Sequence, residues 1–192
     1  MSGLVEDLLL ISRLEERQDL EKDEVDLGDL VINAVNDAAV SSSVHRWRTR
    51  IPDVPVWVCG DPARLHQVVG NLLANARVHT PAGVTVTTSL VPGPGYVELT
   101  VADDGPGIDE ELLPILFDRF VRADKSRSRA LGSTGLGLAI VATIVNAHDG
   151  RVKVESNTAG TIFRVRLPMI REVGEYVTVS ELHNPHISEA NI

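Results

Sequence analysis

Apolar residues recur at helical spacing along the stretch that follows Asp61. Asp61 is a typical N-cap residue and Pro62 suits the first turn, so these two residues predict where a helix begins. The apolar positions then fall at i, i+3, i+4, i+7, i+8 and i+11, and they are Leu65, Val68, Val69, Leu72, Leu73 and Ala76. This stretch therefore predicts a helix with one buried face.

Other segments extend the pattern. Residues 28–40 predict a helix after a short strand at 25–27, residues 110–120 are helix-like, and an apolar run at 138–145 opens from a turn with three glycines. Alternation predicts strands at 54–58, 84–90, 96–101, 151–155 and 161–167, the last four as two hairpins. Residues 41–53 are expected to form a loop or weak strand, and Pro55 indicates an edge strand.

Residues 3–17 carry a further amphipathic pattern, with Leu4, Leu8 and Ile11 near helical spacing. Two interpretations remain open: a helix that lies on its own domain, or one half of a helical hairpin. Because so short a helix is marginally stable alone, we expect residues 1–20 to be disordered or to pair with another chain. The charged stretch 15–26 is expected to form a linker or hinge.

Composition limits the class of protein. The 192 residues suffice for one well-buried domain, and 43% hydrophobic and 23% charged residues are typical of soluble globular proteins. A formal net charge of −9 argues against a general nucleic-acid-binding protein. The single cysteine, Cys59, excludes an internal disulfide framework and fits a reducing cytosol. No apolar run approaches the roughly 20 residues of a membrane helix, and the N-terminus lacks a secretion signal.

Two asparagines lie beside the apolar stripe of the helix that follows Asp61. Asn71 and Asn75 are four residues apart and therefore share one face, although asparagine is a poor helix former. They are either exposed or locally bonded amides, or a pair of amide oxygens that face a metal-bound phosphate. Magnesium takes oxygen ligands and keeps several waters, so one amide plus phosphates would be enough.

Glycine-rich segments supply the remaining candidate chemistry. Asp103 ends a predicted strand beside Gly105 and Gly107, where it either caps a turn or accepts a hydrogen bond from a ligand amine. The glycines before residue 138 lead into a helix start, whose free N–H groups suit phosphate. Between them, residues 109–134 contain a basic stretch that is either a solvated loop or a lid over an anionic ligand.

Taken together and in this order, these segments resemble the sequence boxes of the sensor histidine kinases of two-component systems. Residues 71–76 with 79–81 are similar to the N box, residues 103–108 to the first glycine box, residues 117–120 to the F box, and residues 132–140 to the second glycine box. Residues 160–163, ending in Leu167 and Pro168, resemble the last strand pair. The likeness covers roughly residues 25–168.

The resemblance implies a fold shared with DNA gyrase and the mismatch-repair protein MutL, an α/β (α+β) sandwich in which a mixed, mostly antiparallel sheet packs on helices. By this likeness Asp103 accepts from the adenine amine, Thr161 supports it through water, and Asn75 holds magnesium. The other residues implied in ATP binding are Asn71, His79, Gly105, Gly107, Ile108, Gly132, Thr134, Gly135, Leu136, Gly137 and Leu138. The implied ATP lid includes Phe117, Arg119, Phe120, Arg122 and Lys125.

One position separates two reaction classes. The hydrolytic relatives carry a glutamate four residues before the metal asparagine, whereas this chain has Asn71, and a neutral amide cannot act as a general base. The resemblance therefore favours phosphoryl transfer to a protein histidine over ATP hydrolysis. Two departures from the family pattern are Val78, where a basic residue is common, and Ser133, where glycine is frequent. A degenerate module that only binds a partner is the third hypothesis.

The family's phosphoacceptor histidine has no counterpart before residue 25. We therefore expect residues 1–20 to be the remnant of the second helix of a dimerisation hairpin, residues 21–168 to be the catalytic domain, and residues 169–192 to be a tail. The implied partners are ATP, the chain's own dimerisation domain and a response regulator, and the implied parent is a homodimeric, membrane-anchored bacterial sensor kinase of which this is a cytoplasmic portion. Nucleic acid is not expected as a partner.

Overall fold

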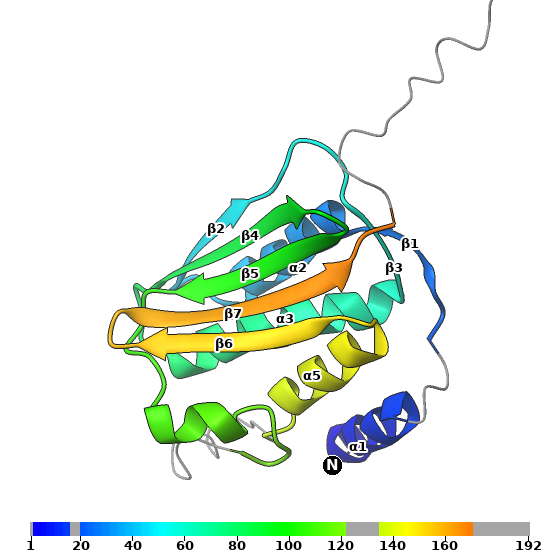
Figure 1. Ribbon diagram of the computed structural model, residues 1–192. Helices are drawn as coiled ribbons and strands as arrows, with labels where there is room; N and C mark the ends of the chain where they lie inside the picture. The colour runs from blue at the N-terminus through cyan, green and yellow to red at the C-terminus, as the bar shows by residue number, and fades with distance from the viewer. Residues whose placement is uncertain (1, 16–19, 122–134, 171–192) are drawn as a thin grey trace, which may run out of the picture.

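The computed structural model describes residues 2–15, 20–121 and 135–170 (Figure 1). Its helices are α1 (Ser2–Glu15), α2 (Leu27–Ser41), α3 (Pro62–His79), the 3-10 helix η1 (Glu110–Ile115) and α5 (Gly137–Ala147). Its strands are β1 (Asp23–Asp26), β2 (Arg46–Arg50), β3 (Trp57–Gly60), β4 (Thr85–Gly93), β5 (Tyr96–Asp103), β6 (Arg151–Asn157) and β7 (Gly160–Pro168).

The main sheet has five strands in the order β2-β4-β5-β7-β6. Only the pair β2-β4 is parallel, and every other neighbouring pair is antiparallel. Helices α2 and α3 lie behind this sheet in Figure 1 and α5 lies below β6, while β1 and β3 form a separate antiparallel pair. The expected sandwich of a mixed, mostly antiparallel sheet on helices is therefore confirmed.

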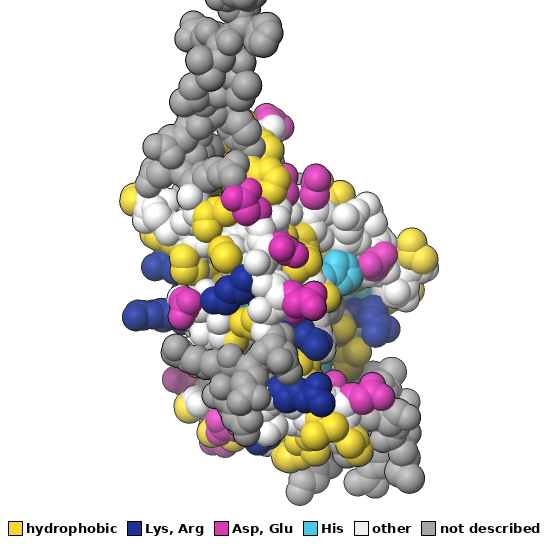
Figure 2. Space-filling model, turned by 90° about the vertical axis from the view of Figure 1, so that its right-hand side faces the viewer, with side chains coloured by type: hydrophobic (Ala, Val, Ile, Leu, Met, Phe, Trp, Pro, Cys, Tyr) yellow, Lys and Arg dark blue, Asp and Glu magenta, His cyan; other side chains and the backbone are white. Residues whose placement is uncertain are grey.

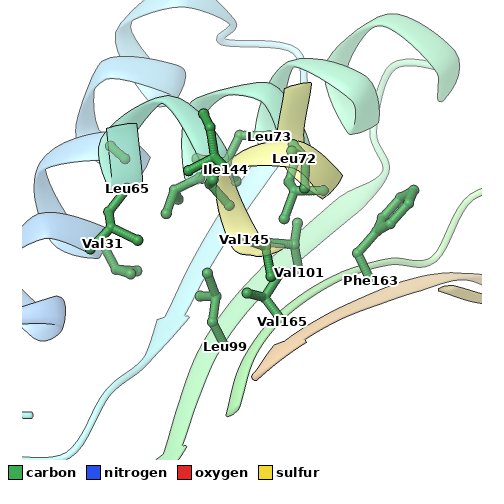
Figure 3. Packing of buried hydrophobic residues seen from close by; sticks show 14 of the residues in the cluster. Val31, Leu65, Leu72, Leu73, Leu99, Val101, Ile144, Val145, Phe163 and Val165 are labelled. Carbon is green, nitrogen blue, oxygen red and sulfur yellow. The ribbon is translucent and has the colours of Figure 1, made fainter. Parts of the chain in front are cut away.

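The core lies between the sheet and the helices. The predicted stripe of α3 is buried, with Leu72 and Leu73 at 0% and 1% exposure, and it faces Leu99 of β5 and Phe163 of β7 (Figure 3). Ile144 of α5 completes this layer. Because alternate residues of a strand face opposite sides, β4, β5 and β7 contribute every second side chain to this core.

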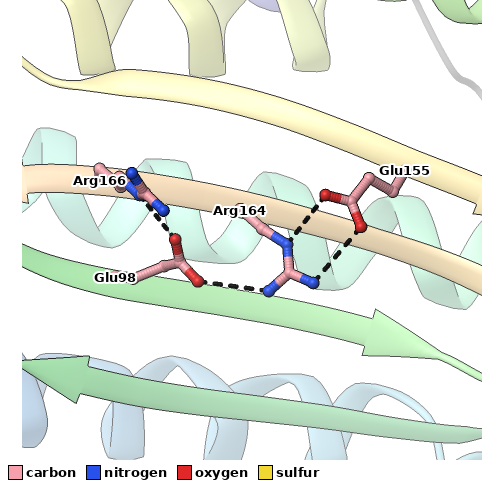
Figure 4. Close-up of polar contacts among 4 residues, drawn as sticks. All are labelled: Glu98, Glu155, Arg164 and Arg166. Carbon is pink, nitrogen blue, oxygen red and sulfur yellow. Dashed lines mark hydrogen bonds and ion pairs between the residues drawn. The ribbon is translucent and has the colours of Figure 1, made fainter.

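The opposite face of the sheet carries polar side chains. Glu98 of β5 accepts hydrogen bonds from Arg164 Nη1 at 3.3 Å and from Arg166 Nε at 2.7 Å, and Arg164 Nε also reaches Glu155 at 3.3 Å (Figure 4). These ion pairs are partly exposed and each contributes little to stability. Their place explains the alternation of apolar and polar residues in the predicted hairpins.

Three expected elements differ from the observed ones. The predicted helix 110–120 is wrong beyond residue 115, where η1 ends, and η1 contains Pro114, which lacks an N–H for helical bonding. The strand expected at 54–58 is shifted to Trp57–Gly60, where it pairs with β1. The Val56 carbonyl still accepts the Leu27 N–H, while the Val56 N–H bonds the Asp26 side chain. Residues 46–50 form a full strand because they pair with β4.

Helix α1 packs beside α5 of the same chain (Figure 1). Ile11 and Leu14 are buried at 0% and 4% exposure, whereas Val5 and Leu9 on the other side remain 57% and 52% exposed. Ser2–Glu15 therefore forms a helix that lies on its own domain, so the expected disorder of residues 1–20 is wrong for this segment. Pairing of its exposed side with another chain stays a prediction.

The surface and the start of the tail complete the description. On the side of the molecule seen in Figure 2, acidic, basic and hydrophobic side chains are interspersed. Of the helices that the structure describes, none is both long and apolar enough to cross a membrane. Met169 and Ile170, expected to belong to a tail, still bond to the small sheet, since Met169 bridges Val58 and the Ile170 N–H reaches the Trp57 carbonyl.

Candidate functional site

The two asparagines of α3 lie where α3 meets the start of α5. Helix α3 begins as predicted, because Asp61 Oδ1 accepts the Arg64 N–H at 3.0 Å. Asn71 and Asn75 are both half-buried, and Asn71 Nδ2 donates to the Gly137 carbonyl at 3.2 Å. Asn71 is thus held by a contact with a distant residue. This differs from the interpretation of an amide that bonds only within its own helix.

The start of α5 is anchored from both sides. Leu136, the N-cap residue, is fully buried, and among the described residues no side chain caps the first turn. Gly135 has φ 71° and its carbonyl accepts the Phe120 N–H at 2.9 Å, while Leu138 is half-buried. The uncapped N–H groups and the positive end of the helix dipole make this turn suitable for an anion. Gly132 and Thr134 lie outside the described residues.

Asp103 is the last residue of β5. It falls at the same alternation as Leu99 and Val101, which places its side chain on the helix-covered side of the sheet, and it is half-buried. Its Oδ1 accepts the Gly105 N–H at 3.0 Å. Burial raises the pKa of the Asp103 carboxyl, and the N–H groups of Gly105 and Thr161 counteract that rise. This carboxyl group combines a rigid position with remaining acceptor capacity.

The loop that follows Asp103 packs against the turn between β6 and β7. Gly107 has φ 83°, and a Cβ there would collide with the Asn157 carbonyl oxygen. Gly160 has φ 141°, and a Cβ there would collide with the Asp103 carbonyl oxygen. Only glycine permits both close approaches. Thr161, buried at 4% exposure, pairs directly with Asp103 across the two strands.

One end of this site depends on Ser156, which the sequence analysis did not single out. Its Oγ accepts the Ile108 N–H at 2.8 Å and lies 3.0 Å from Thr161 Oγ1. The alternation of β6 could have placed Ser156 on the core side, but nothing in the sequence specified which residues it would meet.

The remaining predicted residues lie at the end of α3 and in the segment that follows η1. His79 ends α3, and desolvation lowers the pKa of its imidazole although the residue as a whole is exposed. Phe117 packs edge-on against Phe163 with ring centroids 6.4 Å apart. Arg119 is exposed, and Phe120 is 56% exposed with φ 65°. The expected lid residues Arg122 and Lys125 lie outside the described residues.

Helix α3 runs from the start of α5 to the loop that follows Asp103. Asn71, Asn75 and His79 follow one another at single turns, and the next residue, Thr80, lies beside Gly105, where a Cβ would come within 2.8 Å of the Thr80 methyl carbon. At 1.5 Å per residue, the nine steps from Asn71 to Thr80 span about 13 Å. One helix thus runs from a turn that is suited to an anion to a half-buried carboxyl group, an arrangement that fits a ligand with phosphates at one end and a hydrogen-bonding group at the other.

The donor set near α3 consists of amides. Within residues 2–15, 20–121 and 135–170, no group of three or more His, Cys, Asp or Glu side chains could hold a metal ion. The two asparagine amide oxygens are hard oxygen ligands of the kind that magnesium accepts beside phosphate and water. The residues present therefore fit a magnesium ion that arrives with a phosphate ligand.

Known proteins are similar to this chain in sequence. Residues 60–171 match the family described as histidine kinase-, DNA gyrase B-, and HSP90-like ATPase. The chain is 61% identical over 177 residues to the sensor histidine kinase TrcS of Mycobacterium tuberculosis, covering 90% of this chain and 35% of TrcS. It is 54% identical over 169 residues to the probable sensor histidine kinase TcrY of the same organism, covering 88% and 36%. The chain thus spans roughly a third of these relatives.

Solved structures share the fold. The mycobacterial sensor histidine kinase MprB matches with a TM-score of 0.68 at 29% identity, over 77% of this chain and 97% of that one. The ATP-binding domain of PrrB from Mycobacterium tuberculosis matches at 0.64 and 30%, over 79% and 99%. Full-length ShkA in complex with AMPPNP matches at 0.72 and 26%, over 87% and 35%. The chain therefore belongs to the family of histidine kinase-, DNA gyrase B- and HSP90-like ATPases and carries the catalytic ATP-binding domain of a sensor histidine kinase.

Proposed function

We propose that this domain binds Mg-ATP and positions the γ-phosphate for transfer to a protein histidine rather than to water. This proposal rests on the position of Asn71, whose neutral amide donates a hydrogen bond to the Gly137 carbonyl at the start of α5. An amide cannot take a proton from water, so it cannot serve as the general base of an ATPase. Phosphoryl transfer can proceed without such a base, by positioning and charge stabilisation.

The base of ATP binds at the β5 end of the site. Asp103 accepts from the adenine amine and Thr161 supports it through water, a role to which the buried cross-strand pair of these residues is suited. The backbone of the 105–108 loop, with Gly105, Gly107 and Ile108, approaches the base. His79 packs on the ring, which the low pKa of its imidazole favours by keeping it neutral.

The phosphates bind at the start of α5. We assign the phosphates to residues 132–138, including Gly132, Thr134, Gly135, Leu136, Gly137 and Leu138. We assign the ATP lid to the segment that contains Phe117, Arg119, Phe120, Arg122 and Lys125. Asn75 would hold the magnesium ion, with Asn71 beside it. When bound, the ion supplies positive charge to the phosphates. Support for this assignment comes from the uncapped first turn of α5 and the oxygen donors of α3.

The phosphoacceptor histidine belongs to a dimerisation hairpin of which α1 is the second helix. Val5 and Leu9 support this assignment, because they leave an apolar side of α1 uncovered in the described chain. The parent protein is a homodimeric, membrane-anchored sensor kinase whose cytoplasmic portion includes this domain. The phosphate then passes to an aspartate of a response regulator.

The decisive experiment follows γ-labelled ATP with magnesium on this chain alone. Bound nucleotide, released phosphate and labelled protein are measured on the same samples. We expect saturable binding, no sustained phosphate release, and no stable label on any of the chain's own histidines. Sustained release that scales with Mg-ATP would instead establish an ATPase, and the absence of binding would leave a partner-binding module.

A pair of neighbouring carboxylates provides a matched test of base recognition. Asp103→Asn should weaken ATP binding about 10- to 100-fold, because a hydrogen bond to a charged acceptor contributes about 1.5–3 kcal/mol. Asp104→Asn removes the same charge one residue away, where the side chain instead accepts the Thr85 N–H at 2.6 Å, and should leave affinity nearly unchanged. Equal losses in both variants, measured by calorimetry, would refute the role of Asp103.

A further inference from the structure

Ser156 lies in β6 at the edge of the site that we assign to the adenine base. Along β6 it has the same orientation as Val152 and Val154, so its side chain points to the helix-covered side of the sheet. Ser156 is half-buried. Three polar groups surround its Oγ. The Ile108 N–H lies at 2.8 Å, the Thr161 hydroxyl at 3.0 Å and the Gly160 carbonyl at 3.2 Å.

The hydrogen-bond roles of these groups are constrained. The Ile108 N–H can only donate, so Ser156 Oγ accepts from it. The single proton of Ser156 then goes to one of two acceptors. If it goes to the Gly160 carbonyl, the Thr161 hydroxyl donates to Ser156; if it goes to Thr161, the Thr161 proton is free to point elsewhere. In both arrangements the Ser156 hydroxyl joins the 104–108 loop to Thr161 of β7, and in the first it also bonds the Gly160 carbonyl.

This link fixes a segment that lacks regular secondary structure. Residues 104–109 form neither helix nor strand, so few backbone bonds hold them. Gly107 packs against the Asn157 backbone and Gly105 bonds to Asp103, while the Ile108 N–H depends on Ser156. Loss of the Ser156 hydroxyl would leave this partly buried N–H without its partner, which favours movement of the loop.

We propose that Ser156 is a positioning residue of the base site, which holds the backbone of the 105–108 loop and the Thr161 hydroxyl in place relative to Asp103. Ser156 acts through these neighbours and need not touch the nucleotide. The proposal rests on the proposed binding of ATP at this site. It extends base recognition to a third strand, β6, in addition to β5 and β7.

A pair of nearly isosteric substitutions tests the hydroxyl group itself. Ser156→Thr retains the hydroxyl and Ser156→Val replaces it by a methyl group, so both add similar bulk. Dissociation constants for ATP, ADP and adenosine are measured by calorimetry at one temperature, and melting temperatures are recorded. We expect Ser156→Val to bind all three ligands about 10-fold more weakly than Ser156→Thr, because the 105–108 loop loses the hydrogen bond that holds the Ile108 N–H in place. Adenosine is informative because it lacks phosphates, so a shared loss localises the effect to the base end.

Control variants and further outcomes make the test decisive. Ser89 of β4 pairs with Thr100 of β5 and lies on the face of the sheet away from the helices. The control variants Ser89→Val and Ser89→Thr should therefore bind each ligand with equal affinity. If the wild-type chain fails to bind ATP, the proposed function fails first. If it binds but the Val and Thr variants of Ser156 have equal affinity, the proposal is overturned. Should Ser156→Val not fold, Ser156→Ala is compared with wild type, with faster hydrogen exchange of the Ile108 amide expected and unchanged exchange refuting the link.

Discussion

Gly160 offers a direct test of how the β6-β7 turn supports the site. Its φ of 141° is a backbone conformation that side chains disfavour, and a Cβ there would collide with the carbonyl oxygen of Asp103. In Gly160→Ala we expect two costs to add. The backbone conformation costs about 1–3 kcal/mol, and the forced shift of well-packed groups costs about 1–3 kcal/mol, so the free energy of unfolding should fall by about 2–6 kcal/mol.

Two other glycines separate these costs. Gly95 has φ 71° but a Cβ there would meet no atom within 4 Å, so Gly95→Ala should lose only the backbone part, about 1–2 kcal/mol. Gly70 lies inside α3 with open space around it and an ordinary φ, so Gly70→Ala should gain about 0.5–1 kcal/mol from higher helix propensity. The series therefore ranges from stabilising to strongly destabilising with the same chemical change.

The assay is equilibrium urea unfolding of the three variants, followed by nucleotide binding under conditions where each is folded. Because the atom that Gly160→Ala displaces belongs to Asp103, this variant should also bind ATP more weakly, whereas Gly95→Ala should bind normally. The reasoning is refuted if Gly160→Ala is no less stable than Gly95→Ala, or if it binds ATP as well as wild type.

Two further predictions concern buried polar groups. His148 Nε2 accepts the Asp61 N–H at 3.0 Å while Nδ1 lies 2.8 Å from the Ile144 carbonyl, which requires the neutral ring, and burial lowers the pKa of this imidazole. As pH falls below about 6.5, His148 therefore takes up a proton in the unfolded chain before it does so in the folded chain. The free energy of unfolding should decline from that pH toward the lower pKa of the folded state. His148→Gln should flatten this decline, which urea midpoints between about pH 8 and pH 5 would measure. Thr88 Oγ1 is buried and has no hydrogen-bond partner among the described residues. Thr88→Val should therefore raise the free energy of unfolding by about 1 kcal/mol. A lower free energy of unfolding for this variant, in thermal or urea unfolding, would indicate a missed partner.

Local patterns determined most of the elements. The start of α3 follows from Asp61 and Pro62, and its buried face follows from apolar residues at helical spacing, because caps and periodicity act within a few residues. The two hairpins follow from alternation and turn residues for the same reason. The helix predicted for residues 116–120 is absent because Pro114 and the packing of Phe117 against Phe163 overrode a weak local pattern.

Contacts between distant residues could be established only from the tertiary structure. The motifs named Asn71, Asp103 and the glycine turn, but no local rule places Asn71 against Gly137, 66 residues further along the chain. Nor does one bring Ser156 to Ile108 across 48 residues, since such a contact depends on strand register and on how the sheet packs. The same holds for α1, whose amphipathic pattern is equally compatible with another helix or with α5. The sequence by itself determined the elements and the chemical groups, because propensity and periodicity are local. The tertiary structure decided which groups share a site, because that depends on packing across the whole chain.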